Sequence, residues 1–572
     1  MAIFLLGAFF RFNDLEGVPP EMTSDHMEKL LDSQRVVDGD RDVFFTNNGG
    51  REAFQMYVVA GLVRFFGQDF SFDTLKLATI LEGLLTIGMS YWLGVTLAGE
   101  RNRSLGIALG LALAALIAVS SWHIMLSRLA LRIVLTPLTT ILVTIFLIRA
   151  MRHNHRLDFI WVGFWLGAGI YFYQANRMLP LLVVAGTTLA IVAALPHWRR
   201  MLTYAVNLAL AAWLAFVIFL PMYRYGQEFP EDYWNRTRGR LFGENAFERL
   251  NPATGALERY EPNTREQIER FIDDFDLFRE NYIDALEMYS WAGDGAWISN
   301  GQGRPALDPI TNGLFLLGCL AWGVLFIRQR DPTYLLVPVG IMIMLLPSAL
   351  TLAYQIENPS FTRTSGTLPF VLLLAGYPLA LLTTWGSRVL RQHWVGVGIS
   401  VLIVIPLLFF AAGHNFENYF RTYRDAYAAS WRPYSEIAAP LREFAQDEGS
   451  YGNAFMVAYP HWLDHRILGT VAGDIRWNNG LVTRDELYLM LLRNEGTPYQ
   501  YDPALPMFIM YNRADDETRH WVMERFPGAV EYMQVAGQGL HDFNYVIIPP
   551  GTDWLLALLR ERSMGVGCLD GC

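Results

Sequence analysis

The sequence predicts an α-helical polytopic membrane protein with about 11 spans, followed by a smaller α/β domain. Of the 572 residues, 52% are hydrophobic and only 17% are charged, whereas a soluble chain has roughly a quarter charged residues. The apolar residues come in blocks of about 20 with few or no charges, which is the length of a transmembrane helix. After residue 413 the composition becomes that of an ordinary soluble domain.

The apolar blocks define the predicted spans. They lie at 1–12, 74–98, 104–121, 131–149, 158–175, 177–196, 201–221, 307–327, 332–350, 364–385 and 393–413. The first block is short for a span, so we expect that the chain starts inside the true first helix or is truncated. It lacks the basic start and the small-residue cleavage site of a signal peptide.

Arginine residues indicate which loops lie in the cytoplasm. Five short loops, which alternate with the others, carry Arg101 and Arg103, Arg149, Arg152 and Arg156, Arg199 and Arg200, Arg328 and Arg330, and Arg388 and Arg391. By the positive-inside rule these loops are cytoplasmic. The remaining segments are then predicted to lie on the outer face: 13–73, 122–130, the turn at 175–177, 222–306, 351–363 and 414–572. We expect the inner (cell) membrane of a bacterium.

Two outward segments have their own helical pattern. Residues 51–67 are amphipathic but short for a span, so we expect them at the membrane interface. Residues 265–291 place apolar side chains at helical spacing opposite an acidic face, and we expect this helix to pack over the outer mouth of the bundle. The net charge of −10 does not suggest a nucleic-acid partner, because the acidic residues gather in these outward loops.

The segment 414–572 is predicted to form an extracytoplasmic α/β domain, separate from the membrane module 1–413. Residues 453–459, 506–512 and 543–550 have the composition of strands. Residues 484–494 and 516–526 have the composition of helices.

The stretch TSDHMEK (23–29) places Asp25, His26 and Glu28 in the first outer loop. A carboxylate near the end of a span can act as a general base or bind a metal, although a solvated acidic loop has the same pattern. Four arginines lie at the outer ends of predicted spans, and each is either an interfacial anchor, an ion-pair partner or a ligand-binding residue: Arg128, Arg132, Arg177 and Arg363. Glu82, inside a span, is either a site residue or an ion-pair partner.

Six stretches in this order resemble the C-type glycosyltransferase (GT-C) superfamily, in particular its branch of protein O-mannosyltransferases and lipid A aminoarabinose transferases. They cover roughly residues 1–413 and are GVPPEMTSDHMEK (17–29), GGREAFQMY (49–57), AVSSWHIMLSRLALR (118–132), YFYQANRMLPLL (171–182), NGQGRPALDPITNGLFLLG (300–318) and FTRTSGTLPF (361–370). The resemblance implies a GT-C-like helical bundle. It also implies transfer, with inversion, of a sugar from a polyprenyl-phosphate donor to a lipid, glycan or protein.

The resemblance assigns roles to particular residues. Asp25 falls where this superfamily keeps its catalytic aspartate, and the four outward arginines would hold the donor phosphate. Substrate-binding residues are expected in the matching stretches at His26, Glu28, Arg51, Glu52, Tyr173 and Gln174. No metal-ligand spacing is recognisable, although a divalent metal near Asp25 stays open and His461, Asp464 and His465 lie close together in the tail.

The chain departs from the family pattern at three positions. His26 stands in place of the usual acidic residue after the aspartate, Glu52 and Ala53 stand in place of a Pro-Pro pair, and Arg132 replaces an acidic residue. These departures leave the sugar, the acceptor and any membrane protein partners open. Two other functions also stay open: a flippase or transporter for a lipid-linked sugar, and a non-catalytic subunit of a larger membrane assembly.

Overall fold

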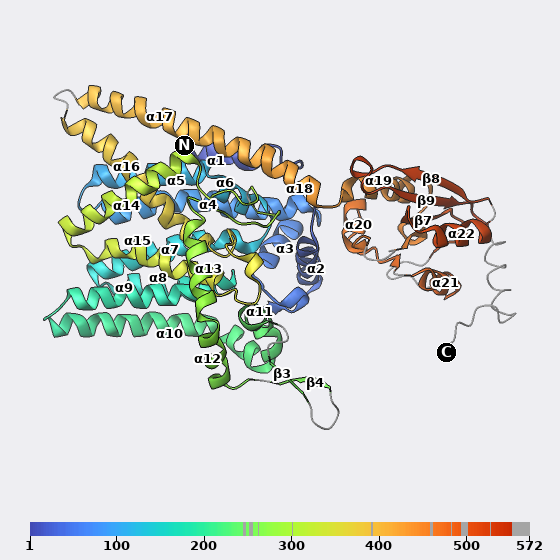
Figure 1. Ribbon diagram of the computed structural model, residues 1–572, viewed down its shortest axis with the longest axis horizontal. Helices are drawn as coiled ribbons and strands as arrows, with labels where there is room; N and C mark the ends of the chain where they lie inside the picture. The colour runs from blue at the N-terminus through green and yellow to red at the C-terminus, as the bar shows by residue number, and fades with distance from the viewer. Residues whose placement is uncertain are drawn as a thin grey trace. The chain divides into compact units, whose positions relative to one another are not determined.

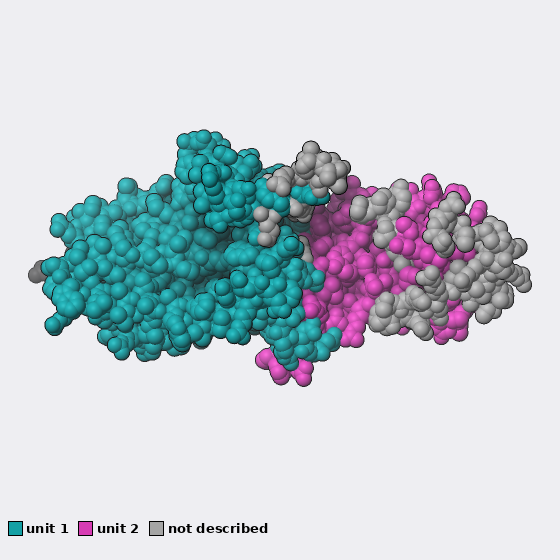
Figure 2. Space-filling model, turned by 90° about the horizontal axis from the view of Figure 1, so that it is seen from below, with its two compact units in different colours: residues 1–19, 36–62, 75–427 teal, residues 20–35, 63–74, 428–572 magenta. Residues whose placement is uncertain are grey.

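The computed structural model describes residues 1–243, 247–250, 256–260, 262–299, 301–389, 393–457, 462–481, 483–493, 501–526 and 528–551. It divides into two compact units, coloured separately in Figure 2. Unit 1 comprises 1–19, 36–62 and 75–427, and unit 2 comprises 20–35, 63–74 and 428–572. The sequence-based division at residue 413 falls inside a helix. Two pieces of the first outer loop belong to the same unit as the C-terminal domain.

Each of the predicted spans corresponds to a helix (Figure 1). These helices are α1 (Ala2–Phe12), α4 (Phe72–Ala98), α5 (Arg103–Val119), α7 (Leu135–His153), α8 (Arg156–Gly169), α9 (Leu179–Ala193), α10 (Trp198–Glu228), α14 (Pro309–Gln329), α15 (Leu336–Ala349), α16 (Leu368–Val389) and α17 (His393–Glu417). Apart from the start of α4, they lie in unit 1. The predicted helical membrane module is therefore confirmed.

Among the described residues, eight helices are long and apolar enough to cross a membrane. A ninth span results if α5 and the following α6 (Ser121–Arg128), which meet at 61°, are one broken span. The helices α1 and α8, with 11 and 14 residues, are shorter than the bilayer requires. The chain is an integral membrane protein.

Helix α7 forms the centre of the bundle. In its apolar window 94% of the residues are buried, compared with 17% for α10. Helix α8 packs closely between α7 and α10, because Gly163 leaves room for the backbone of Ala211: a Cβ at Gly163 would lie 2.4 Å from the Ala211 carbonyl oxygen. Small residues allow such close helix contacts in membranes.

Three of the loops predicted to be cytoplasmic meet at one end of this bundle. The Arg152 guanidinium donates to the carbonyl oxygens of Thr96 (2.8 Å) and Leu97 (2.7 Å), and to Asp331 (3.3 Å). Arg101 lies 3.2 Å from the same Asp331 carboxylate. The contacts agree with the prediction that these loops share one side of the membrane.

The segments of unit 1 that are predicted to face outward carry short elements, one of which, the helix at 54–66, ends in unit 2. These are β1 (Phe44–Phe45) paired antiparallel with β2 (Arg51–Glu52), α3 (Phe54–Phe66), α11 (Pro230–Phe242), β3 (Glu248–Leu250), β4 (Leu257–Arg259), α12 (Thr264–Asp273) and α13 (Phe275–Glu287). The predicted acidic helix is thus two helices. Helix α13 runs beside α15, because the Tyr282 hydroxyl donates to the Met342 carbonyl (2.9 Å) and the Asn281 amide to the Ala349 carbonyl (3.3 Å).

Unit 2 contains a five-stranded sheet with helices, as predicted for the C-terminal domain. The strand order is β6 (Gly480–Leu481), β5 (Ala454–Val457), β7 (Met507–Asn512), β9 (Phe543–Ile548) and β8 (Val530–Gln534). Strand β5 runs parallel to β6 and β7, whereas β9 is antiparallel to both of its neighbours. The helices are α2 (Ser24–Asp38, from the predicted first outer loop), α18 (Arg424–Ser430), α19 (Tyr434–Glu443), α20 (His465–Ala472), α21 (Arg484–Arg493) and α22 (Asp516–Arg525). Helix α2 ends in unit 1, and helix α18 begins there.

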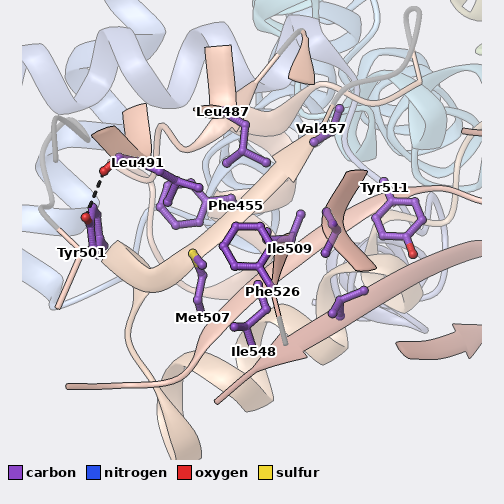
Figure 3. Close-up of a cluster of buried hydrophobic side chains, with 12 residues drawn as sticks. Phe455, Val457, Leu487, Leu491, Tyr501, Met507, Ile509, Tyr511, Phe526 and Ile548 are labelled. Carbon is purple, nitrogen blue, oxygen red and sulfur yellow. Dashed lines mark hydrogen bonds between the residues drawn. The ribbon is translucent and has the colours of Figure 1, made fainter. Parts of the chain in front are cut away.

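One face of this sheet is closed by an apolar core (Figure 3). Phe455 and Ile509 from the central strands meet Leu487 of α21, and Val522 of α22 completes the cluster. The sequence identified these strands and helices because each presents apolar residues at the spacing of its own element.

Arg128 fastens the start of the first outer loop. Its buried guanidinium donates to a set of backbone carbonyl oxygens at 2.6–3.4 Å, those of Phe10, Arg11, Asn13, Asp14 and Val18. It also lies 5.6 Å from the ring centre of Tyr419 and 5.1 Å from that of Phe420. All three guanidinium nitrogens of Arg128 are therefore used within the protein, and none is left for a ligand.

Replacing Arg128 with lysine is expected to lower the free energy of unfolding by about 2 kcal/mol or more. A lysine keeps the charge but cannot reach this set of carbonyls with a planar fork. Thermal unfolding of the purified protein in detergent measures the loss. The exposed Arg103→Lys is the control and should leave the midpoint unchanged. Equal midpoints for wild type and Arg128→Lys would contradict this role.

Candidate functional site

Four arginines surround a cavity of about 130 Å³ in unit 1. They come from the 3-10 turn η3 (Gln174–Met178), from α11, and from the segment after α15. The cavity is lined by Tyr173, Gln174, Ala175, Arg177, Met178, Arg236, Thr237, Arg240, Leu241, Pro347, Leu350, Thr351 and Arg363. None of these described lining residues is acidic, so the cavity suits an anion.

The turn η3 places Arg177 at the start of α9. The Asn176 side-chain amide donates to the Gly169 carbonyl (2.9 Å) and ties the turn to the end of α8. Pro180 lies in the first turn of α9, where its missing N–H does not remove an intrahelical hydrogen bond. The N-terminal end of a helix carries partial positive charge, which adds to the attraction of this cavity for anions.

Aromatic rings hold the Arg177 guanidinium. Its central carbon lies 4.7 Å from the ring centre of Tyr233 and 5.8 Å from that of Trp234, both in α11. It contacts the Thr237 hydroxyl at 3.3 Å, and its Nε is buried without a hydrogen-bond partner among the described residues. Ring stacking fixes the guanidinium plane but uses none of its N–H groups, so Arg177 keeps donors for a ligand.

Arg363 and Arg240 share one carboxylate, that of Glu357. Arg363 also donates to the Thr351 hydroxyl at 2.9 Å. Burial alone would raise the pKa of Glu357, but hydrogen bonds from the two guanidinium groups outweigh burial and lower this pKa below its ordinary value. The ion pair therefore stabilises the fold at neutral pH and is lost as pH falls through the lowered pKa.

Arg236 completes the cavity wall. It makes no hydrogen bond or ion pair within the part of the chain that the structure describes. Arg236 and Arg240 are one helical turn apart in α11, so both side chains lie on one face. The sequence analysis did not select them, because nothing in residues 222–306 showed where α11 would pack. Their i, i+4 spacing beside Thr237 was the available signal.

Glu52 joins two of the predicted arginines. The Arg132 Nε donates to the Glu52 carboxylate at 2.9 Å, and both side chains are buried. Arg177 lies 3.9 Å from the other oxygen of Glu52, and Arg132 stacks 5.5 Å from the ring centre of Tyr173. The structure therefore brings together four of the predicted site residues, whereas Arg51 is buried beside them in β2.

This contact explains two of the departures from the family pattern. In the pattern of the expected resemblance, the position of Glu52 is a proline and the position of Arg132 is an acidic residue. In this chain the two unusual residues neutralise each other. An unpaired buried charge is costly, so either departure alone would be strongly destabilising.

The TSDHMEK stretch forms the first turns of α2 in unit 2. Asp25 is half-buried in the first turn, and the Lys29 ammonium donates to its backbone carbonyl at 2.8 Å. His26 is buried, and its Nδ1 accepts the Thr23 N–H at 2.9 Å while the ring lies 4.8 Å from that of Phe72. Since Nδ1 is an acceptor, the neutral ring carries its proton on Nε2.

The tail holds the other side of this helix. Arg466 donates to Glu28 at 2.7 Å and to Asp464 through two nitrogens at 2.8 and 2.9 Å. Burial would raise the pKa of Asp464, but the Arg466 guanidinium and other donors lower it below its ordinary value. The predicted substrate ligand Glu28 is therefore engaged in an ion pair that joins α2 to α20.

Two other candidates remain without a role. His461 lies outside the described residues, and among the described ones no group of three or more His, Cys, Asp or Glu side chains could hold a metal. Glu82 is buried in α4, and neither of its oxygens has a hydrogen-bond partner in the described part of the chain.

The Glu52–Arg132 pair can be tested by a double-mutant cycle. Glu52→Gln is expected to lower the free energy of unfolding by roughly 3–5 kcal/mol, because it leaves the buried Arg132 guanidinium without its carboxylate. Arg132→Met should cost less, because Arg177 still lies 3.9 Å from Glu52. The double variant should lose less free energy of unfolding than the sum of the losses in the two single variants. Unfolding midpoints of the four proteins in detergent measure the coupling. Strict additivity would show that the two side chains do not depend on each other.

Comparison with known proteins supports the fold. No protein-family profile and no curated protein sequence matches this chain. The crystal structure of ArnT from Cupriavidus metallidurans bound to undecaprenyl phosphate is similar, with 14% identity, a TM-score of 0.54, and coverage of 97% of this chain and 98% of that one. The archaeal oligosaccharyltransferase AglB from Archaeoglobus fulgidus, in complex with an inhibitory peptide and a dolichol-phosphate, has 11% identity, a TM-score of 0.49, and coverage of 95% and 73%. The chain therefore has the fold of the aminoarabinose transferase ArnT, and the expected GT-C resemblance is confirmed at the level of the fold.

Proposed function

We propose that this protein is a glycosyltransferase that moves a sugar from a polyprenyl-phosphate donor to an acceptor on the outer face of the membrane. The observation that carries the proposal is the arginine-lined cavity at the start of α9. It is supported by the likeness of the fold to ArnT, whose structure holds undecaprenyl phosphate. The acceptor is a hydroxyl-bearing lipid, glycan or protein.

The donor phosphate would bind to Arg177 and Arg363. A guanidinium presents two parallel N–H groups to phosphate oxygens, which gives both charge and geometry. The cavity of about 130 Å³ exceeds the ~30 Å³ of one water molecule several times, so it suits a phosphate group rather than a whole lipid. Arg236 supplies a further cation, and Glu52 keeps Arg132 and Arg177 from repelling each other.

The reaction would be a direct displacement. The acceptor oxygen attacks the anomeric carbon, the bond from that carbon to the phosphate oxygen breaks, and the electron pair leaves with the polyprenyl phosphate. The acceptor hydroxyl loses its proton to a base, for which we propose Asp25 from its place in the family pattern. Direct displacement inverts the anomeric centre. The arginines stabilise the negative charge that grows on the leaving phosphate.

The first test measures release of polyprenyl phosphate from a panel of polyprenyl-phosphate sugars. Asp25→Asn is expected to abolish most turnover, because the amide cannot accept the proton, while the unfolding midpoint stays that of wild type. Asp38→Asn, in the same helix but beyond the family motif, is the control. Equal turnover in wild type and Asp25→Asn would remove Asp25 from the mechanism. Parallel assays with a chelator test for a divalent metal.

The arginine cavity has its own test. Arg177→Ala is expected to reduce kcat/KM for the donor by roughly 10–100-fold, the value of one lost charge-assisted contact. Arg177→Lys should recover only part of the lost kcat/KM, because an ammonium group cannot present two parallel N–H groups to the phosphate. Arg199→Ala, at the other side of the membrane by the arginine pattern, is the control. If no donor in the panel is turned over by wild type, a transporter or a non-catalytic subunit becomes the better interpretation.

A further inference from the structure

A second cavity, of about 330 Å³, lies at the opposite end of α9 from the arginine cavity. Arg177 and Met178, directly before α9, line the first cavity, whereas Ala190, Ala193 and Ala194, at the end of α9, line the second. A helix of 15 residues separates two such ends by roughly 22 Å. By the arginine pattern this second end is cytoplasmic, so the cavity plays no part in the proposed transfer reaction.

The carboxylates around this second cavity are already engaged. Asp331 accepts from the Thr333 N–H (3.0 Å) and hydroxyl (2.8 Å), and it pairs with Arg101 and Arg152. Glu100 contacts the His153 ring at 2.9 Å and lies 3.8 Å from the Arg152 guanidinium. Neither carboxylate is left to neutralise a further cation.

Arg200 is that further cation. It lines the cavity near the start of α10, and its side chain makes no hydrogen bond or ion pair in the described ranges of the chain. Its guanidinium carbon lies 5.9 Å from the ring centre of Tyr204, and the Tyr204 hydroxyl is fixed by the Met151 carbonyl at 2.6 Å. The ring holds the guanidinium in place without using its N–H groups. The cavity therefore presents a held cation to an anionic ligand.

The surroundings of the cavity indicate a lipid rather than a soluble anion. Three alanines of α9 form an apolar wall, and the next residues along the chain expose large apolar side chains: Val192 and Leu195 are 57% exposed and Trp198 is 65% exposed. Tryptophan at the end of a span marks the level of the lipid headgroups. Basic pockets between transmembrane helices on the cytoplasmic side suit anionic headgroups, while acyl chains lie on the apolar exterior.

We propose that this cavity binds the headgroup of an anionic phospholipid of the cytoplasmic leaflet, with its phosphate on Arg200. The side chains of Arg101 and Arg152 supply positive potential behind it. The lipid would tie the ends of α7, α9 and α10 together and stabilise the bundle. This inference does not depend on the proposed transferase activity.

The test uses the full chain in a neutral detergent and short-chain lipids as probes. Dihexanoyl-phosphatidylglycerol is expected to raise the unfolding midpoint saturably, whereas dihexanoyl-phosphatidylcholine and inorganic phosphate do not. Arg200→Ala should weaken this effect at least ~10-fold in apparent affinity, the value of one lost charge-assisted contact. Arg199→Ala is the matched control, because its neighbouring guanidinium stacks on Trp198 and does not line the cavity.

Three results would overturn the proposal. Equal protection by inorganic phosphate would identify a soluble anion as the ligand. Equal protection by phosphatidylcholine would show that the headgroup charge is not recognised. Equal loss in Arg199→Ala and Arg200→Ala would show a diffuse charge effect instead of a site. Ala193→Phe, which fills the cavity without changing the charge, is a second variant and should also weaken the lipid effect.

Discussion

The need to compensate each buried arginine organises this structure. A cation inside a membrane protein is costly unless dipoles or carboxylates surround it. The chain meets this requirement in different ways: backbone carbonyls surround Arg128, Glu52 neutralises Arg132, and aromatic rings hold Arg177. The same physical requirement separates structural from functional arginines, because only a side chain with unused N–H groups can take a ligand. By that criterion Arg177 and Arg236 are available, and Arg128 is not. Arg363 is available in part, because only its two terminal nitrogens donate to other described residues.

Much of the fold was predictable because each transmembrane helix produces a local pattern of apolar residues in the sequence. A block of apolar residues must bury its backbone polar groups in a helix whatever its neighbours are, so all the predicted spans proved to be helices. The strands β5, β7 and β9 also followed from local pattern. The number of true spans was less predictable, since α1 and α8 are shorter than their apolar blocks and α5 bends into α6 at Ser120.

The site was only partly predictable because its members come from distant segments. Six predicted site residues lie around or beside one cavity in the structure: Arg132, Arg177, Arg363, Glu52, Tyr173 and Gln174. The sequence could not select Arg236 and Arg240, since their role depends on how α11 packs. Nor could it foresee that Glu28 pairs with Arg466, far along the chain, so that the helix carrying Asp25 forms one unit with the C-terminal domain. A conformational change in the C-terminal domain can therefore act on α2 through the Glu28–Arg466 ion pair.

The Glu52–Arg132 pair shows how two apparent losses of a family pattern can be one substitution. Considered alone, a glutamate in place of proline and an arginine in place of an acidic residue both suggest a degenerate site. At 2.9 Å in a buried setting they are a single ion pair, and Arg177 lies near its free oxygen. In this chain the acidic charge of the pair lies in β2 and the positive charge lies in the segment before α7. The two charges cancel, so the departures leave no uncompensated charge at this place, and Arg177 keeps donors for an anion.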